Sequence, residues 1–214
     1  IVLRQMCVNI NKHNIIYDKR IFMLEKEKKL IIEKIQNSDI DICVNISGCG
    51  FQFLNNILKI SGASKFLLNA EIPYSKLVLE EFYKIKSPYV TEENAKKLSL
   101  TSLNKFIKVK NNNILVSVGC IGTIKTYYDK KGSEKIYIYI ISSNKKEYSF
   151  EINFKKDSNA SREEQDEKIN ILILTLLNNF IDNNYEIEIG ENKFKYLISS
   201  SDAIVNIKEK VINE

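Results

Sequence analysis

A short apolar run that passes through a glycine-rich turn into a helix most constrains the fold of this chain. Residues 41–46 are apolar and partly β-branched, which predicts a buried strand. Residues 51–60 predict a helix, and Ser47-Gly48-Cys49-Gly50 joins the two segments. A strand, a tight turn and a helix in succession indicate a layered α/β protein.

The same turn is a candidate ligand site. The chain has only seven glycines in 214 residues, yet Gly48, Gly50 and Gly62 fall within one short stretch. Glycine lets backbone come close to a ligand, and the first N–H groups of a helix have no partner inside it. Such turns also serve simply to pack a helix on a sheet, so the pattern alone leaves both interpretations open.

The remainder of the chain continues the alternation of strands and helices. We expect helices at 20–36, 75–83, 91–107 and 161–182, an extended segment at 66–73, a strand at 113–118, and an antiparallel pair at 135–141 and 147–154. Residues 119–123 predict a second glycine turn, 185–197 a hairpin and 208–214 a helix. Ligands of open α/β sheets bind outside the carboxyl ends of strands, so the two glycine turns are expected to face one crevice.

Composition narrows the classes of partner. The net charge is +5, but lysines alternate with glutamates, as in residues 25–29, so a nucleic-acid partner is not expected. No apolar run has the roughly 20 residues of a membrane span, and no signal peptide opens the chain, so we expect no membrane partner and a cytoplasmic protein. Four cysteines without C-x-x-C spacing and a single histidine, His13, predict neither a metal site nor a catalytic histidine.

Five short motifs, in order and spacing, resemble the CinA C-terminal domain family and most closely its eukaryotic branch. They are Ser47 to Gly50, Ser61-Gly62-Ala63-Ser64, Pro73-Tyr74-Ser75, Val118 to Gly122 and Ser161-Arg162-Glu163-Glu164. The resemblance covers about residues 20–183 and implies a three-layer α/β/α sandwich with a mostly parallel central sheet and an antiparallel hairpin extension. It predicts a domain at 1–183, followed at 184–214 by a hairpin and helix that lead into a domain outside this chain.

Bacterial members of that family include nicotinamide-nucleotide amidases, which hydrolyse the carboxamide of nicotinamide mononucleotide to nicotinate mononucleotide and ammonia. The resemblance implies that Ser47 is the nucleophile and that Tyr74 or Lys76 assists it. It also implies a small nucleotide ligand, no cofactor, and a homo-oligomer. The implied substrate-binding residues are Gly48, Cys49, Gly50, Gly62, Ser64, Ser75, Gly119, Cys120, Gly122, Thr123 and Arg162.

The chain departs from the bacterial pattern at one position that matters for chemistry. The bacterial motif has lysine five residues after its tyrosine, and this chain has Leu79 there. A serine without a base to accept its proton is a poor nucleophile. An amidase therefore stands beside two alternatives: a catalytically degenerate nucleotide-binding or dimerisation module, fused to a nucleotidylyltransferase in the longer protein, and a purely structural α/β domain.

Overall fold

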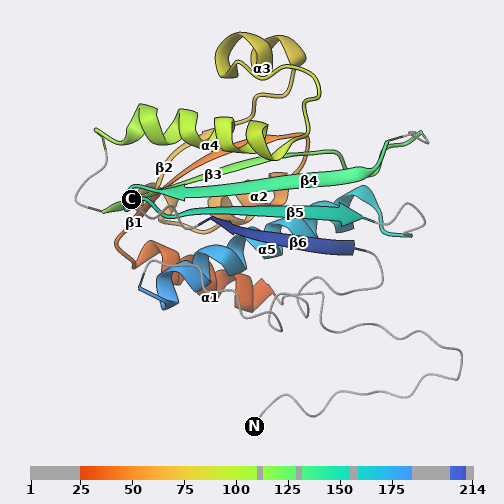
Figure 1. The fold of residues 1–214 in the computed structure, drawn as a ribbon. Coiled ribbons are helices and arrows are strands. Elements are labelled where there is room, and N and C mark those ends of the chain that lie inside the picture. Colours follow the sequence, from red (N-terminus) through yellow and green to blue (C-terminus); the bar gives the residue numbers. More distant parts are fainter. Residues whose placement is uncertain (1–24, 110–112, 129–131, 155–158, 185–202, 211–214) are drawn as a thin grey trace, which may run out of the picture.

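A single mixed sheet forms the centre of the molecule (Figure 1). The computed structural model describes residues 25–109, 113–128, 132–154, 159–184 and 203–210, the last by its backbone alone. The strands are β1 (Ile40–Ser47), β2 (Leu67–Glu71), β3 (Ile114–Gly122), β4 (Glu134–Ser142), β5 (Glu147–Phe154) and β6 (Ala203–Lys210). Their order is β2-β1-β3-β4-β5-β6; β2, β1 and β3 are parallel, and β4, β5 and β6 each pair antiparallel with the preceding strand.

Helices cover both faces of this sheet (Figure 1). They are α1 (Glu25–Gln36), α2 (Phe51–Lys59), α3 (Lys76–Tyr83), α4 (Glu92–Phe106) and α5 (Arg162–Asp182), with a 3₁₀ turn, η1 (Ala63–Lys65). One face carries α1, α2 and α5, and the other carries α4 with α3 beyond it. The predicted three-layer α/β/α fold, with a parallel core and an antiparallel extension, is confirmed.

Strand β1 shows why two helical layers form. Ile42, Val44 and Ile46 point into the larger core, which they share with α1, α2 and α5. On the other face, Asn45 is fully buried and its side-chain amide donates to the Leu98 carbonyl of α4, 2.7 Å away. Every residue of β1 is buried, as expected for a strand covered on both sides.

Helix α4 lies unusually close to β3. A Cβ at Gly119 would stand 2.3 Å from the carbonyl oxygen of Ala95, so only glycine fits under this helix. Beside it, the Ser99 hydroxyl donates to the Ser117 carbonyl at 2.8 Å, and the Ser117 hydroxyl donates back to the Ser99 carbonyl at 2.7 Å. Small residues on both elements thus hold α4 against the sheet.

Two sequence predictions are wrong in a way that bears on function. Residues 119–122 are the last part of β3 and not a turn, because β4 pairs with them as far as Gly122. Residues 208–210 belong to β6, which pairs with β5, and not to a helix. The predicted hairpin at 185–197 lies outside the described residues.

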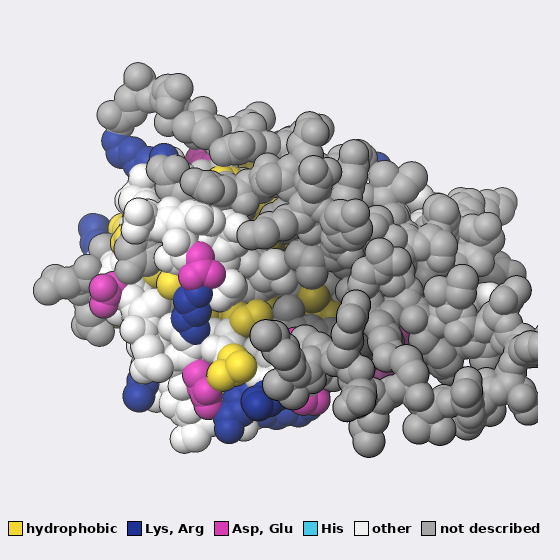
Figure 2. Space-filling model, turned by 90° about the horizontal axis from the view of Figure 1, so that it is seen from below, with side chains coloured by type: hydrophobic (Ala, Val, Ile, Leu, Met, Phe, Trp, Pro, Cys, Tyr) yellow, Lys and Arg dark blue, Asp and Glu magenta, His cyan; other side chains and the backbone are white. Residues whose placement is uncertain are grey.

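Helix α1 packs one apolar face against the larger core. Ile32 and Ile35 are buried in it, whereas Leu30 is 56% exposed. Lys28 is also buried and forms ion pairs with Glu25 and with Glu167 of α5. Basic and acidic side chains lie next to each other on the described part of the lower face (Figure 2).

Candidate functional site

The carboxyl ends of β1 and β2 meet at Ser47. Its side-chain hydroxyl donates a hydrogen bond to the carbonyl oxygen of Pro73 at 2.8 Å, and the residue is only 5% exposed. Pro73 is itself buried and begins the connection from β2 to α3. Ser47 therefore fastens the end of β1 to this connection, and its proton is held by a backbone carbonyl that cannot act as a base.

The turn that follows Ser47 requires its glycines. Gly48 and Gly50 have φ angles of +86° and +92°, in the left-handed region. A Cβ at Gly48 would stand 2.1 Å from the carbonyl oxygen of Gly122 in β3. The close backbone approach predicted here is thus real, and the atom that approaches belongs to the chain's own sheet.

An internal carboxylate occupies the N-terminus of α2. Asp166, a buried residue of α5, accepts hydrogen bonds from the N–H groups of Gly50 and Gln52; the second is 2.8 Å long. Sequence reasoning missed Asp166, although an acidic residue one helical turn after Arg162 was a usable signal. Two of the N–H groups in this candidate ligand site, those of Gly50 and Gln52, are therefore already paired.

Arg162 begins α5 at the same edge of the sheet, as predicted. Its guanidinium donates to the carbonyls of Gly48 at 3.1 Å and of Lys125 at 3.0 Å, and its side chain is exposed. Ser161 caps the helix in a capping box with Glu164. Arg162 thus ties the turn after β1 to the segment after β3 and presents the remainder of its guanidinium to solvent.

The predicted helpers of Ser47, Tyr74 and Lys76, make contacts with other residues. Tyr74 is 66% exposed, and its ring lies 6.3 Å from that of Phe51. Ser75 is the N-cap of α3 and accepts from the Val78 N–H at 3.2 Å. The Lys76 ammonium lies 5.7 Å from the centre of the Tyr89 ring. In the described part of the chain, neither Tyr74 nor Lys76 hydrogen bonds to Ser47.

Leu79 stands in an apolar cluster between α3, α4 and the sheet. It is 5% exposed. The buried members of the cluster are Leu79, Tyr83, Ile85, Ala95, Leu98, Ile121, Tyr139 and Ile141. The position at which the bacterial family has lysine is therefore part of the core here, and the side chain that fills it can neither accept nor donate a proton.

Three predicted binding residues of β3 and its end have packing or backbone roles. Cys120 lies with its sulfur 3.9 Å from that of Cys49, and both are fully buried. Burial and the neighbouring Cys120 raise the pKa of the Cys49 thiol well above its usual value. A Cβ at Gly122 would stand 2.6 Å from the Ile136 side chain. Thr123 continues the pairing with β4 through its N–H, which donates to the Lys135 carbonyl.

Gly62 and Ser64 lie near the amino end of β2, whereas Ser47 lies at the carboxyl end of β1, so the length of the sheet separates them. They precede β2, beside the end of α1, where the Gln36 amide donates to the Ser61 carbonyl at 3.0 Å. Helix α2 runs back along the sheet between the two places, because β1 and β2 are parallel. The structure therefore does not bring these two residues to the predicted site.

A polar cluster that the sequence did not reveal lies between the end of β2 and α4. The Glu71 carboxylate accepts from the Lys105 ammonium at 2.7 Å and from the Tyr83 hydroxyl. Burial alone would raise the pKa of Glu71, but the hydrogen bonds from Lys105, Tyr83 and Asn69 outweigh it and lower that pKa. Burial and the Glu71 carboxylate together raise the pKa of Tyr83. The cluster borders a groove of about 480 Å³ beside α3.

No protein-family model matches the sequence, and no curated protein matches it either. Solved structures do match: the competence/damage inducible protein CihA from Agrobacterium tumefaciens has a TM-score of 0.53 at 15% identity, over 75% of this chain and 94% of that chain. A competence-damaged protein (CinA) superfamily protein from Klebsiella pneumoniae has a TM-score of 0.58 at 9% identity, over 75% and 99%. One from Escherichia coli has a TM-score of 0.51 at 10% identity, over 78% and 99%.

The chain has the CinA fold. The resemblance predicted from the five motifs is thereby confirmed at the level of the fold. The described residues contain no group of three or more histidine, cysteine and acidic side chains arranged to hold a metal ion. Nor does any described helix combine the length and apolar character needed to cross a bilayer.

Proposed function

We propose that this chain is a CinA-type domain without amidase activity, and that it binds an anionic nucleotide at the carboxyl edge of its sheet. Leu79 carries the first part of the proposal, because an apolar core residue replaces the lysine of the bacterial motif. The Ser47 hydroxyl also donates to a carbonyl and has no neighbouring base among its hydrogen-bond partners in the described residues. A serine in that setting remains protonated and unreactive toward an amide.

Arg162 supports the second part. A guanidinium has five N–H donors in one plane, and the Gly48 and Lys125 carbonyls take two of them. Both contacts hold the side chain in one orientation at the edge of the sheet where α/β proteins bind ligands. A phosphate group that accepted two of the remaining donors would form the charge-assisted, bidentate pair for which arginine is suited. Fusion to a nucleotidylyltransferase stays a prediction.

The catalytic part is tested by measuring ammonia release. Purified protein is incubated with nicotinamide mononucleotide, and the wild type is compared with Ser47→Ala under the same conditions. We expect no release above that of the Ser47→Ala variant. Release by the wild type that the substitution abolishes would overturn the proposal and restore the amidase interpretation.

The binding part is tested by ligand-dependent thermal stabilisation. Nicotinamide mononucleotide, nicotinate mononucleotide and adenosine monophosphate are each added at millimolar concentration, and the melting temperature is measured. We expect at least one to raise it in the wild type and in Lys65→Gln, which removes an exposed charge at the opposite edge of the sheet, but not in Arg162→Gln. Equal shifts in all three proteins, or none in any, would contradict a site at Arg162.

A further inference from the structure

We propose that the groove between α1, α2 and the start of α5 binds a short peptide of about three residues by its two charged ends. The groove has a volume of about 790 Å³, within the range of small-molecule sites. Every described residue that lines it is polar or charged. Arg162 is not among them, so the proposal does not rest on the proposed nucleotide site.

Most charged side chains of the groove already have partners within the chain. The nearly buried Lys28 of α1 forms ion pairs with Glu25 and with Glu167 of α5. Its hydrogen bond lowers the pKa of Glu25, and the more distant charge of Lys59 adds to this effect. Glu164 takes part in the capping box of α5. These charges therefore stabilise the packing of the helices and contribute little to the choice of a ligand.

Two side chains of opposite charge at the groove remain without partners. Glu163 lies in the first turn of α5, and Lys59 lies at the end of α2. Neither side chain forms a hydrogen bond or an ion pair with another residue in the described part of the chain, and both are exposed. One unpaired carboxylate and one unpaired ammonium in one groove suit a ligand that carries one charge of each sign.

The groove also contains a buried amide. Asn56 of α2 is only 6% exposed, and its side chain has no hydrogen-bond partner among the described residues. It lines both the groove and an adjoining hollow of about 320 Å³. An amide that is withdrawn from water without a partner is unfavourable, so a ligand that hydrogen bonds to it gains affinity. The side-chain amide both donates and accepts, and a peptide group offers the complementary acceptor and donor.

The spacing of the two charges sets the length of the ligand. Gln52, at the start of α2, donates its N–H to Asp166, and Glu163 precedes Asp166 by almost one turn of α5. Glu163 therefore lies near the start of α2, whereas Lys59 ends it. At about 1.5 Å per residue, Gln52 and Lys59 are about 10 Å apart along the helix axis. An extended peptide spans roughly 3.3–3.6 Å per residue, so about three residues reach from Glu163 to Lys59 and bring a peptide group to Asn56.

Other small ligands match the groove less well. In a free amino acid both charges are attached to one carbon atom, too close together to reach Glu163 and Lys59 at once. A polyamine has no anionic group for Lys59. A divalent metal ion needs several ligands that converge on one point, and within the described ranges no three histidine, cysteine or acidic side chains are arranged in that way.

The first experiment titrates the protein with tri-alanine and follows its amide signals by NMR spectroscopy. We expect a dissociation constant of about 1 mM. The N-acetylated peptide and the C-terminal amide each lack one charge, so each should bind at least about threefold more weakly, and free alanine more weakly still. No change in the spectrum at about 20 mM tri-alanine would overturn the proposal. Equal affinity for the blocked peptides would contradict recognition of the charged ends, and equal affinity for alanine would contradict the length.

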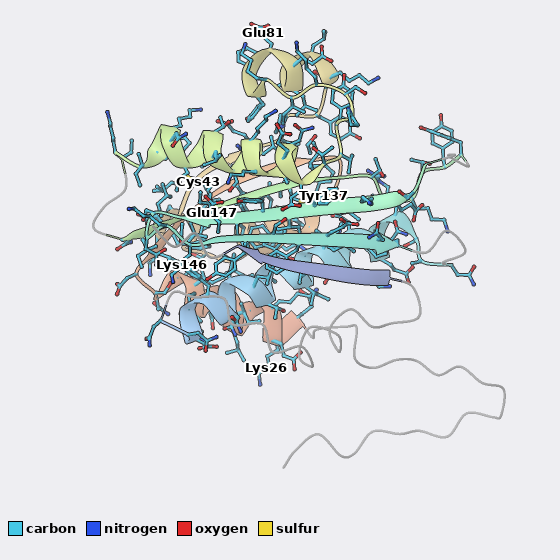
Figure 3. The ribbon with its side chains drawn as sticks, viewed as in Figure 1. Lys26, Cys43, Glu81, Tyr137, Lys146 and Glu147 are labelled. Atoms are coloured by element: carbon cyan, nitrogen blue, oxygen red, sulfur yellow. The ribbon has the colours of Figure 1, made fainter. Side chains whose placement is uncertain are left out.

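A matched pair of variants locates the site. Glu163→Gln removes the unpaired carboxylate of the groove. Glu81→Gln makes the same change at an exposed glutamate of α3, which lies on the other face of the sheet and points away from it (Figure 3). We expect Glu163→Gln to weaken the binding of tri-alanine at least about threefold and Glu81→Gln to leave it unchanged. The same affinity in both variants would overturn the location.

Asn56→Leu separates a ligand-binding amide from a structural one. Leucine is close to asparagine in size, and the Asn56 side chain has no described partner to lose. The ligand-free variant should therefore be at least as stable in urea as the wild type, although it should bind tri-alanine at least about threefold more weakly. A urea midpoint below that of the wild type, or unchanged binding, would contradict the role given to Asn56.

Discussion

Replacing Leu79 with lysine introduces the residue of the bacterial motif and tests whether this position is core or catalytic site. Leu79 is 95% buried, so its apolar surface contributes about 2–3 kcal/mol to the free energy of unfolding. The lysine stem would retain part of that burial, but its ammonium would enter a cluster of apolar side chains. Desolvation that lowers the pKa of this lysine by about one unit while it stays charged adds about 1.4 kcal/mol. We expect a loss of about 3–4 kcal/mol in total.

The loss is measured by urea denaturation followed by far-UV circular dichroism, which suits a chain without tryptophan. Leu77→Lys is the matched control: the same substitution two residues away, at a side chain that is 77% exposed, should change the free energy of unfolding by less than about 0.5 kcal/mol. A loss below about 1 kcal/mol for Leu79→Lys would refute the reasoning. It would mean that a lysine at this position finds a polar environment, as the amidase interpretation requires.

Two further predictions concern stability. Asp166→Asn removes the carboxylate charge that accepts hydrogen bonds from the Gly50 and Gln52 N–H groups at the positive end of α2. We expect the substitution to lower the free energy of unfolding, measured in urea, by about 2 kcal/mol. A loss below about 0.5 kcal/mol would contradict the role of Asp166 as the cap of α2. Because the pKa of Glu71 is lowered in the folded state, its contribution is present above about pH 4.5 and is lost as the pH falls through the folded value. Glu71→Gln should therefore lower the urea midpoint more at pH 7 than at pH 3, and an equal effect at both would contradict it.

Local sequence patterns predicted those elements whose causes are local. The apolar run of β1 and the helical spacing of α5, with Ser161 as its cap, appear in the structure where the sequence placed them. The end of β3 was predicted as a turn because it contains glycines. Glycine is required at position 119 for another reason, since the Ala95 carbonyl of α4 leaves no room for a Cβ there. The strand at 203–210 was missed because an alternating segment needs a partner, and that partner, β5, lies some fifty residues earlier.

The candidate site shows the same limit. The sequence predicted that Ser47, Gly48, Gly50 and Arg162 share one site. The structure places them together at the carboxyl ends of the strands. It could not show that Asp166 would reach the turn, since 116 residues separate Asp166 from Gly50. Nor could it place Gly62 at the far edge, because that depends on how α2 returns along the sheet.

The internal contacts at this edge decide how a ligand could bind there. Ser47 donates to Pro73, and the N–H groups at the start of α2 donate to Asp166. A ligand that took these donors would exchange one hydrogen bond for another and would leave the Asp166 carboxylate buried without partners, which opposes binding. Arg162 differs from these donors in that it is exposed. Its guanidinium has five N–H groups, of which the two carbonyl contacts use two. An anion bound at this edge would therefore derive its affinity mainly from Arg162, because Asp166 already accepts from the Gly50 and Gln52 N–H groups.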